Sequence, residues 1–153
     1  VRRRCHQVVV LDSGCDPDFT YDDLGNALRK IRIDLGVPIT FHDQHSRPLR
    51  ERQRRCAVAT IEYSRVDPGS EDGVLIYIKP LLRGTEPPDV ASYAAAHPAF
   101  PHQSTADQWF DESQTESYRS LGLLTVDEIC GGWQGGTLDS LRQHVETVYL
   151  PTT

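Results

Sequence analysis

Residues 8–19 read VVVLDSGCDPDF, and this stretch decides the fold of the N-terminal half. Four consecutive apolar residues are typical of a strand that is covered on both faces, as in a parallel sheet. Glycine, proline and aspartate follow, and these residue types favour turns. We therefore predict a buried strand over residues 6–12 that ends in a turn. Asp12 stands at that junction, where it is either a catalytic group or a turn residue.

A helix is predicted over residues 20–35, directly after this turn. Its apolar residues recur at helical spacing and form one stripe: Leu24, Ala27, Leu28, Ile31 and Leu35. Thr20 is the expected N-cap, with Asp23 at the capping-box position, and Gly36 and Pro38 are the expected stop. The PITF segment that begins at Pro38 is a candidate second strand. Strand, helix and strand at this spacing indicate one α/β crossover.

Two further strands are predicted over residues 56–64 and 73–80, which are rich in β-branched and aromatic residues. The connection between them contains Asp-Pro-Gly, a turn signal, so we expect an antiparallel hairpin with a long connection. Together with the crossover, this hairpin predicts a mixed α/β fold. Residues 1–82 would form the sheet with its first helix, and residues 83–153 a helical extension packed on it.

Three helices are predicted in that extension, over residues 87–97, 104–122 and 137–150. For the second, Ser104 is the expected N-cap, with Asp107 at the capping-box position, and Gly122 the expected end. Its stripe at helical spacing comprises Ala106, Trp109, Phe110, Ser113, Ser117 and Leu121. The stripe of the last helix comprises Leu138, Leu141, Val145 and Val148.

The composition excludes several classes of protein. The 153 residues are 38% hydrophobic and 25% charged, and no apolar run approaches the ~20 residues that span a bilayer. The net charge of −6 argues against a dedicated nucleic-acid binder. The first residue is Val rather than Met, which fits a fragment, a processed product or an engineered boundary. We expect a protein that is cytoplasmic or peripheral at the membrane.

The four cysteines are Cys5, Cys15, Cys56 and Cys130, and none lies in a C-x-x-C pair. Their spacing does not resemble a zinc site, so we expect free thiols. Cys15 is a poor nucleophile because its acidic neighbours would raise the pKa of its thiol. The G-x-S-x-G elbow of serine hydrolases is absent, and Ser13 lies in LDSGC instead. The chain therefore offers no complete catalytic set.

Three other groups of residues each leave two interpretations open. Asp12, Asp16 and Asp18 could bind a hard cation, although aspartate also favours turns for its own hydrogen bonds. The histidines His97 and His102, near Trp109, fit either a binding site or a rigid loop with packed aromatics. Two arginine clusters could contact anionic lipid headgroups or be solvated: Arg2, Arg3 and Arg4, and Arg47, Arg50, Arg52, Arg54 and Arg55.

Two stretches resemble a known family. LDSGCDPDFTYDDLGNALRKIRIDLGV begins at Leu11, and YIKPLLRGTEPPDVASYAAAHPAFPHQSTADQWFDESQTESYRSLG begins at Tyr77. Both are similar to the C-terminal part of large bacterial patatin-like phospholipases, and the resemblance covers most of residues 8–122. It implies an α/β fold in which a serine attacks an acyl ester, an aspartate assists proton transfer and backbone N–H groups bind the oxyanion.

The same resemblance implies where the chemistry lies. The family's serine sits in G-x-S-x-G and its aspartate in D-G-G or D-G-A, and neither motif occurs here. In the family, D-G-G precedes text similar to the VRRRC that opens this chain. Asp12 is therefore assigned to a turn, and we assign no catalytic, cofactor-binding or metal-binding residue. The chain would support the upstream part of the same protein and would contact phospholipid through the arginines. Two alternatives are an independent lipid- or protein-binding module and a small metal-dependent enzyme using residues 12–18.

Overall fold

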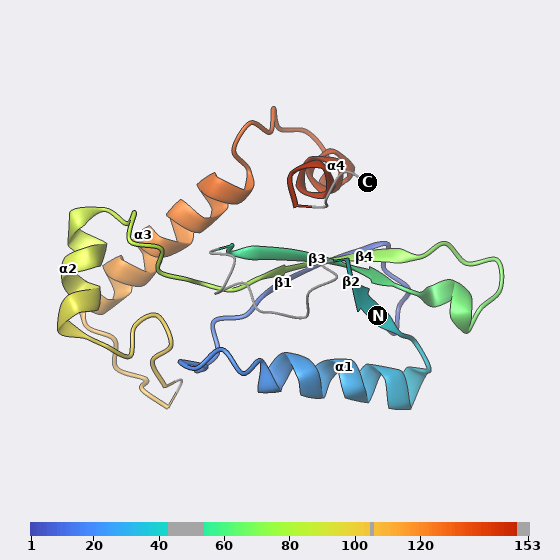
Figure 1. The fold of residues 1–153 in the computed structure, drawn as a ribbon, viewed down its shortest axis with the longest axis horizontal. Helices are drawn as coiled ribbons and strands as arrows, with labels where there is room; N and C mark the ends of the chain where they lie inside the picture. The colour runs from blue at the N-terminus through green and yellow to red at the C-terminus, as the bar shows by residue number, and fades with distance from the viewer. Residues whose placement is uncertain (43–53, 105, 150–153) are drawn as a thin grey trace.

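Four strands form one sheet in the order β1-β4-β3-β2 in the computed structural model (Figure 1). The structure describes residues 1–42, 54–104 and 106–149. The strands are β1 (Gln7–Leu11), β2 (Ile39–Phe41), β3 (Cys56–Ile61) and β4 (Gly73–Ile78). β1 runs parallel to β4, whereas the β2–β3 and β3–β4 pairs are antiparallel. The sheet is mixed, as predicted for the fold class.

The predicted hairpin and crossover are both present. β3 and β4 pair from Cys56 opposite Ile78 to Ile61 opposite Gly73, and the connection contains the 3-10 helix η1 (Tyr63–Arg65). β1 and β2 point in the same direction, because β2 is antiparallel to β3, which is antiparallel to β4. They lie at opposite edges, however, so the hairpin fills the centre of the sheet between the two ends of the crossover.

Helix α1 (Asp22–Leu35) begins two residues after the predicted start. The prediction of Thr20 as N-cap was wrong, since the Asp16 carboxylate accepts the N–H groups of Thr20 at 2.8 Å and Tyr21 at 3.2 Å. Tyr21 occupies the N-cap position with φ 57° and makes no side-chain cap bond. The helix ends as predicted at Gly36, whose φ of 67° is a left-handed conformation that glycine adopts without strain.

The sheet has a helix over each face (Figure 1). α1 lies over one face and α4 (Leu138–Tyr149) over the other. Side chains alternate along the strands, so each face has its own apolar cluster. On the α1 side the buried members are Val37, Ala59, Ile61, Tyr63 and Leu75. On the α4 side they are Cys56, Val58, Ile76, Ile129 and Val145.

β1 is not the doubly covered strand that its sequence predicts. Val9, Val10 and Leu11 are 52%, 37% and 66% exposed. β1 lies at the edge of the sheet, and α4 packs on β3 and reaches β1 at Gln7, whose Nε2 donates to Asp139 Oδ1 at 2.5 Å. Val9 shares the α4 side of the sheet with its partner Ile76, but no described helix extends far enough to cover it.

Helix α2 (Pro88–Ala96) forms as predicted, and it packs on α3 (Glu112–Ile129). The predicted start of the second helix at Ser104 and its end at Gly122 were wrong. Asp111 is the N-cap, and its carboxylate accepts the Gln114 N–H at 2.7 Å. The helix continues through Gly122, and its buried stripe is Gln114, Ser117, Leu121, Thr125 and Ile129. Trp109 and Phe110 therefore lie before the helix rather than on its packed face.

Only part of the stripe predicted for α4 is buried. Val145 is completely buried and Leu141 partly so, whereas Leu138 is 65% and Val148 49% exposed. None of the helices within the described part of the chain is long and apolar enough to cross a bilayer.

Candidate functional site

Asp12 and Lys79 directly follow the parallel strands β1 and β4. The Asp12 N–H donates to the Ile78 carbonyl at 2.8 Å, so the two strand ends lie side by side. In α/β sheets, ligands bind outside the carboxyl ends of parallel strands, where a turn leads from the strand into a helix. This edge is therefore the candidate functional site on topological grounds.

The side chain of Lys79 is 1% exposed and its charge is balanced by two carboxylates. Its Nζ lies 3.1 Å from Asp12 Oδ2 and 3.6 Å from Asp16 Oδ2. The Tyr77 hydroxyl also donates to Asp12, and the Gly14 N–H donates to Asp12 Oδ1 at 3.0 Å. Asp12 is thus the turn residue that was predicted, but it also belongs to a buried ion pair. The signal missed in the sequence is the lysine that ends the apolar run GVLIYIK.

Several neighbours set the protonation state of this cluster. Burial by itself would raise the pKa of Asp12, but the Tyr77 hydroxyl, the Gly14 N–H and Lys79 together hold it below its usual value. The pKa of Asp16 is lowered as well, because the hydrogen bonds from Thr20 and Tyr21 and the charge of Lys79 outweigh burial. Burial and the Asp12 carboxylate raise the pKa of the Tyr77 hydroxyl. Asp12 and Asp16 are therefore carboxylates at neutral pH, and Tyr77 is a protonated phenol.

This arrangement argues against a metal site formed by Asp12, Asp16 and Asp18. The Lys79 ammonium occupies the position beside Asp12 and Asp16 that a cation would need. Within residues 1–42, 54–104 and 106–149, no three His, Cys, Asp or Glu side chains are arranged to hold a metal ion. The carboxylates instead tie the loop between β1 and α1 to the end of β4.

The two histidines near Trp109 support the packed-loop interpretation. His97 stacks on Tyr93 with ring centroids 3.9 Å apart, and its Nδ1 lies 3.0 Å from the Tyr93 carbonyl. His102 is 5% exposed and meets the Phe19 ring edge-on at 4.6 Å. Burial and the nearby Lys79 charge lower the pKa of His102. His102 therefore joins the loop before α3 to the loop after β1 as a neutral side chain.

The cysteines are free thiols, as predicted. Cys5 and Cys15 are exposed, whereas Cys56 lies in the core under α4. Burial raises the pKa of the Cys56 thiol to about 12, which keeps it protonated and unreactive.

Arg55, placed by its sequence context in a solvated or lipid-facing cluster, is completely buried. Its guanidinium lies 2.7 Å from Glu86 and 2.5 Å from Glu128, and its Nε donates to the Leu81 carbonyl at 2.8 Å. Arg83 binds the other oxygen of Glu128 at 2.5 Å. These bonds join the start of β3 to α3, so Arg55 serves the fold and not a surface.

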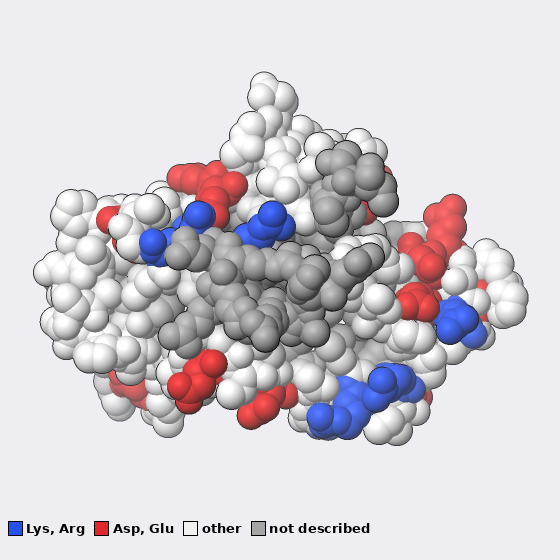
Figure 2. All heavy atoms as spheres, viewed as in Figure 1, with Lys and Arg blue, Asp and Glu red and all other residues white. Residues whose placement is uncertain are grey.

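The remaining arginines of the two clusters differ in their surroundings. Arg54 lies 5.7 Å from the centre of the Tyr149 ring, and Arg4 lies 5.1 Å from that of Tyr63. Arg2 and Arg3 are exposed. Arg47, Arg50 and Arg52 lie outside the described residues. Figure 2 shows another group of basic side chains over the C-terminal half of α1, where Arg29, Lys30 and Arg32 are exposed.

An apolar groove of about 280 Å³ runs between α1 and the sheet, and all four strands contribute to its lining. The inner face of α1 contributes Leu24, Leu28 and Ile31, and β1 contributes Val8 and Val10. The stripe predicted for α1 therefore does face the sheet, yet no residue of α1 is fully buried. The groove marks the place where the packing of α1 on the sheet is incomplete.

No protein-family model matches the sequence, and no curated protein or solved structure is significantly similar to it. The function of the chain is therefore inferred from its own geometry.

Proposed function

We propose that this chain is the non-catalytic C-terminal segment of a patatin-like acyl hydrolase. In this proposal it supplies one edge of the sheet, and the upstream part of the same protein carries the serine and aspartate that cleave the acyl ester. The resemblance of residues 11–37 and 77–122 to the patatin-like family motivates the proposal.

The exposed edge of β1 is the observation that carries the proposal. The bonds from Val74 N–H to the His6 carbonyl and from Asp12 N–H to the Ile78 carbonyl place the even-numbered residues of β1 against β4. In a parallel pair, the N–H and C=O groups of the alternate residues Val9 and Leu11 then point to the open edge. Their side chains are also more than half exposed.

Natural sheets protect such edges with charges, proline, bulges or a covering element. β1, with the sequence QVVVL, carries no charge and no proline. A continuous apolar strand is typical of the interior of a parallel sheet, so this strand fits a position with a neighbour on each side. The apolar groove beside α1 supports the same conclusion, because Val8, Val10 and Leu11 of β1 line it and a further element could fill it.

In the proposed enzyme, the charged side chains of this cluster hold the loop after β1 in place and take no part in the reaction. Lys79, Asp12 and Asp16 fix the loop at the carboxyl ends of β1 and β4, the edge at which α/β enzymes place their reacting groups. The ammonium and both carboxylates are already paired with one another, so none is assigned the role of acid, base or nucleophile.

Ester hydrolysis tests the proposal. The chain alone and the chain extended by the sequence encoded before Val1 would be assayed with a p-nitrophenyl acyl ester. We expect turnover by the extended chain and none by the chain alone. Turnover by the isolated chain that Asp12→Ala abolishes would place the chemistry here and overturn the proposal. Absence of turnover from both proteins would overturn the assignment to an acyl hydrolase.

An independent, non-catalytic binding module is the second candidate. Its support is that the described residues contain three apolar clusters of their own and a buried ion pair between Arg55 and Glu86. Cooperative melting of a monodisperse isolated chain, together with binding to phospholipid vesicles through Arg2 and Arg3, would favour this candidate. An aggregated or molten chain would count against it.

A further inference from the structure

A hollow of about 350 Å³ lies between α1 and β2, at the edge of the sheet opposite to β1. Arg29 and Arg32 of α1 line it, and their spacing of three residues places them on one face of the helix. Both side chains are exposed, and among the described residues neither takes part in an ion pair or a hydrogen bond. Glu62, which accepts a bond from Thr40 of β2, pairs with Arg65 instead. The α1–β2 hollow is therefore lined by two guanidinium groups that no described carboxylate neutralises.

β2 is the second edge strand of the sheet, and part of its backbone faces outward. The Glu62 N–H donates to the Pro38 carbonyl at 2.9 Å. In an antiparallel pair this bond directs the even-numbered residues of β2 toward β3, so the N–H and C=O groups of Ile39 and Phe41 point away from β3. Ile39 lines the same hollow as the two arginines, so the open strand edge and the cations adjoin.

Gly25 of α1 also lines the α1–β2 hollow. Glycine is less favourable than alanine inside a helix. Apart from the backbone of the helix itself, no heavy atom lies within 4 Å of the place where a Cβ of residue 25 would stand. Packing within the described chain therefore does not require a glycine here. A segment lying in the hollow would use this space to approach the α1 backbone closely, so Gly25 is a second observation that points to an occupant.

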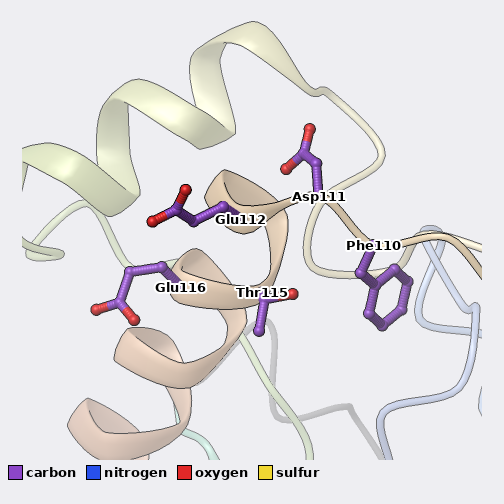
Figure 3. A pocket seen from close by; sticks show the side chains of 5 residues that line it. All are labelled: Phe110, Asp111, Glu112, Thr115 and Glu116. Atoms are coloured by element: carbon purple, nitrogen blue, oxygen red, sulfur yellow. The ribbon is translucent and has the colours of Figure 1, made fainter.

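The charge of the surface selects the kind of occupant. Lys30 is exposed beside the two arginines, and Figure 2 shows basic side chains gathered over this part of α1. The hollow over the first two turns of α3 has the opposite charge, because Asp111, Glu112 and Glu116 line it (Figure 3). An acidic segment is therefore attracted to α1 and repelled from α3, although the chain as a whole carries a net charge of −6.

We propose that the α1–β2 hollow binds an acidic, extended segment of a partner protein. The segment adds to β2 as a further strand, with backbone hydrogen bonds to Ile39 and Phe41. Side chains alternate between the two faces of a strand, so acidic residues at every second position meet Arg29 and Arg32. Each guanidinium can bind a carboxylate through two parallel hydrogen bonds, which gives the contact its geometry.

A phosphate group alone is a poorer fit to this surface. It would pair with the arginines but would leave the outward N–H and C=O groups of Ile39 and Phe41 unused. β2 is also short and bordered by cations, two features that protect an edge strand from pairing with identical chains and that favour an acidic strand. β1 lies at the opposite edge, so the inference stands independently of the proposed hydrolase role.

Peptide binding to the 153-residue chain tests the inference. The probe is a fluorescently labelled peptide of alternating glutamate and valine, and its matched control replaces each glutamate with glutamine. We expect the glutamate peptide to bind and the glutamine peptide not to bind. Two further forms are N-methylated, one at every glutamate and one at every valine. Only alternate N–H groups of an added strand face β2, so one methylated form should bind like the parent and the other should not bind.

Variants of the chain locate the binding. Arg29→Gln and Arg32→Gln should each weaken binding by about fivefold. Lys30→Gln is the matched control, because it removes the same charge from the same helix at a residue outside the lining of the hollow, and it should weaken binding by less than about twofold. Gly25→Leu fills the hollow and should weaken binding by about tenfold, whereas thermal melting should show that the variant is at least as stable as the parent chain.

Three results would overturn the inference. Equal weakening by Lys30→Gln and the two arginine variants would show diffuse attraction. Unchanged binding by Gly25→Leu, or equal binding of both methylated peptides, would show that the peptide does not lie in the hollow as a strand. Binding of inorganic phosphate or phosphatidylserine vesicles that needs Arg29 and Arg32, without binding of the glutamate peptide, would replace the protein partner with a phosphate-bearing ligand.

Discussion

The ammonium of Lys79 lies 3.1 Å from the carboxylate of Asp12, and this buried ion pair joins the carboxyl ends of β1 and β4. Asp16 adds a second carboxylate at 3.6 Å and also holds the backbone N–H groups of Thr20 and Tyr21. One lysine therefore fixes the strand ends, the turn that follows β1 and the start of α1. Its removal would affect all of them together.

Lys79→Met tests how much this ion pair contributes to the free energy of unfolding. The variant leaves two carboxylates beside a buried apolar side chain, so we expect the free energy of unfolding in urea to fall by about 3 kcal/mol. Lys30→Met removes the same charge from an exposed position on α1 and should change stability by less than about 0.5 kcal/mol. Equal effects of the two variants would show that the pair contributes nothing specific.

Acid should destabilise the fold in two stages. Burial and Lys79 lower the pKa of His102 from its ordinary value of 6.5. As the pH falls, the imidazole of the unfolded chain therefore takes up a proton at a higher pH than that of the folded chain. Stability should therefore fall as the pH drops below about 6.5 toward the lowered pKa of His102. The pKa values of Asp12 and Asp16 are lowered from the ordinary value of 3.8. The stability that these two carboxylates contribute is therefore fully present above pH 3.8 and is lost as the pH falls through their lowered pKa values.

His102→Leu separates the two stages. The variant keeps an apolar contact with Phe19 and cannot take up a proton, so urea unfolding at a series of pH values should lose the first stage only. A first stage that persists unchanged in His102→Leu would mean that another group causes it.

Asp111 should cap α3, whereas Ser104 should not. Asp111→Ala removes the acceptor of the Gln114 N–H and should destabilise the fold by about 1 kcal/mol in thermal or urea unfolding. Ser104→Ala loses only a bond from the Ala106 N–H in an exposed turn and should cost less than about 0.5 kcal/mol. The reverse order of costs would indicate that the helix begins at Ser104, as the sequence pattern suggests.

Local patterns in the sequence predicted most of the elements. The stripe on α1 faces the sheet, Gly36 ends that helix, and the two β-branched runs pair as a hairpin. These features depend on residues that are close in sequence. Helix starts were harder to predict, because Asp16 binds the N–H groups of Thr20 and Tyr21, and Asp111, rather than Ser104, caps α3.

Features that depend on distant residues were not predictable. Arg55 ends a polar, arginine-rich run that reads as solvated loop, yet its partners Glu86 and Glu128 lie 31 and 73 residues away. The partners of Lys79 are similarly remote, since Asp12 lies 67 residues away. The exposure of β1 was also hidden, because a sequence pattern predicts that a strand should be covered without showing what covers it.

Amide hydrogen exchange at Val9 and Leu11 tests the central claim most directly, namely that β1 is an interior strand of a larger sheet. The exchange rates would be compared between this chain alone and the chain extended by the sequence encoded before Val1. We expect the two amides to exchange quickly in the chain alone and to become protected in the extended protein, while the Val10 amide is protected in both. Equally fast exchange of Val9 and Leu11 in both proteins would contradict the account.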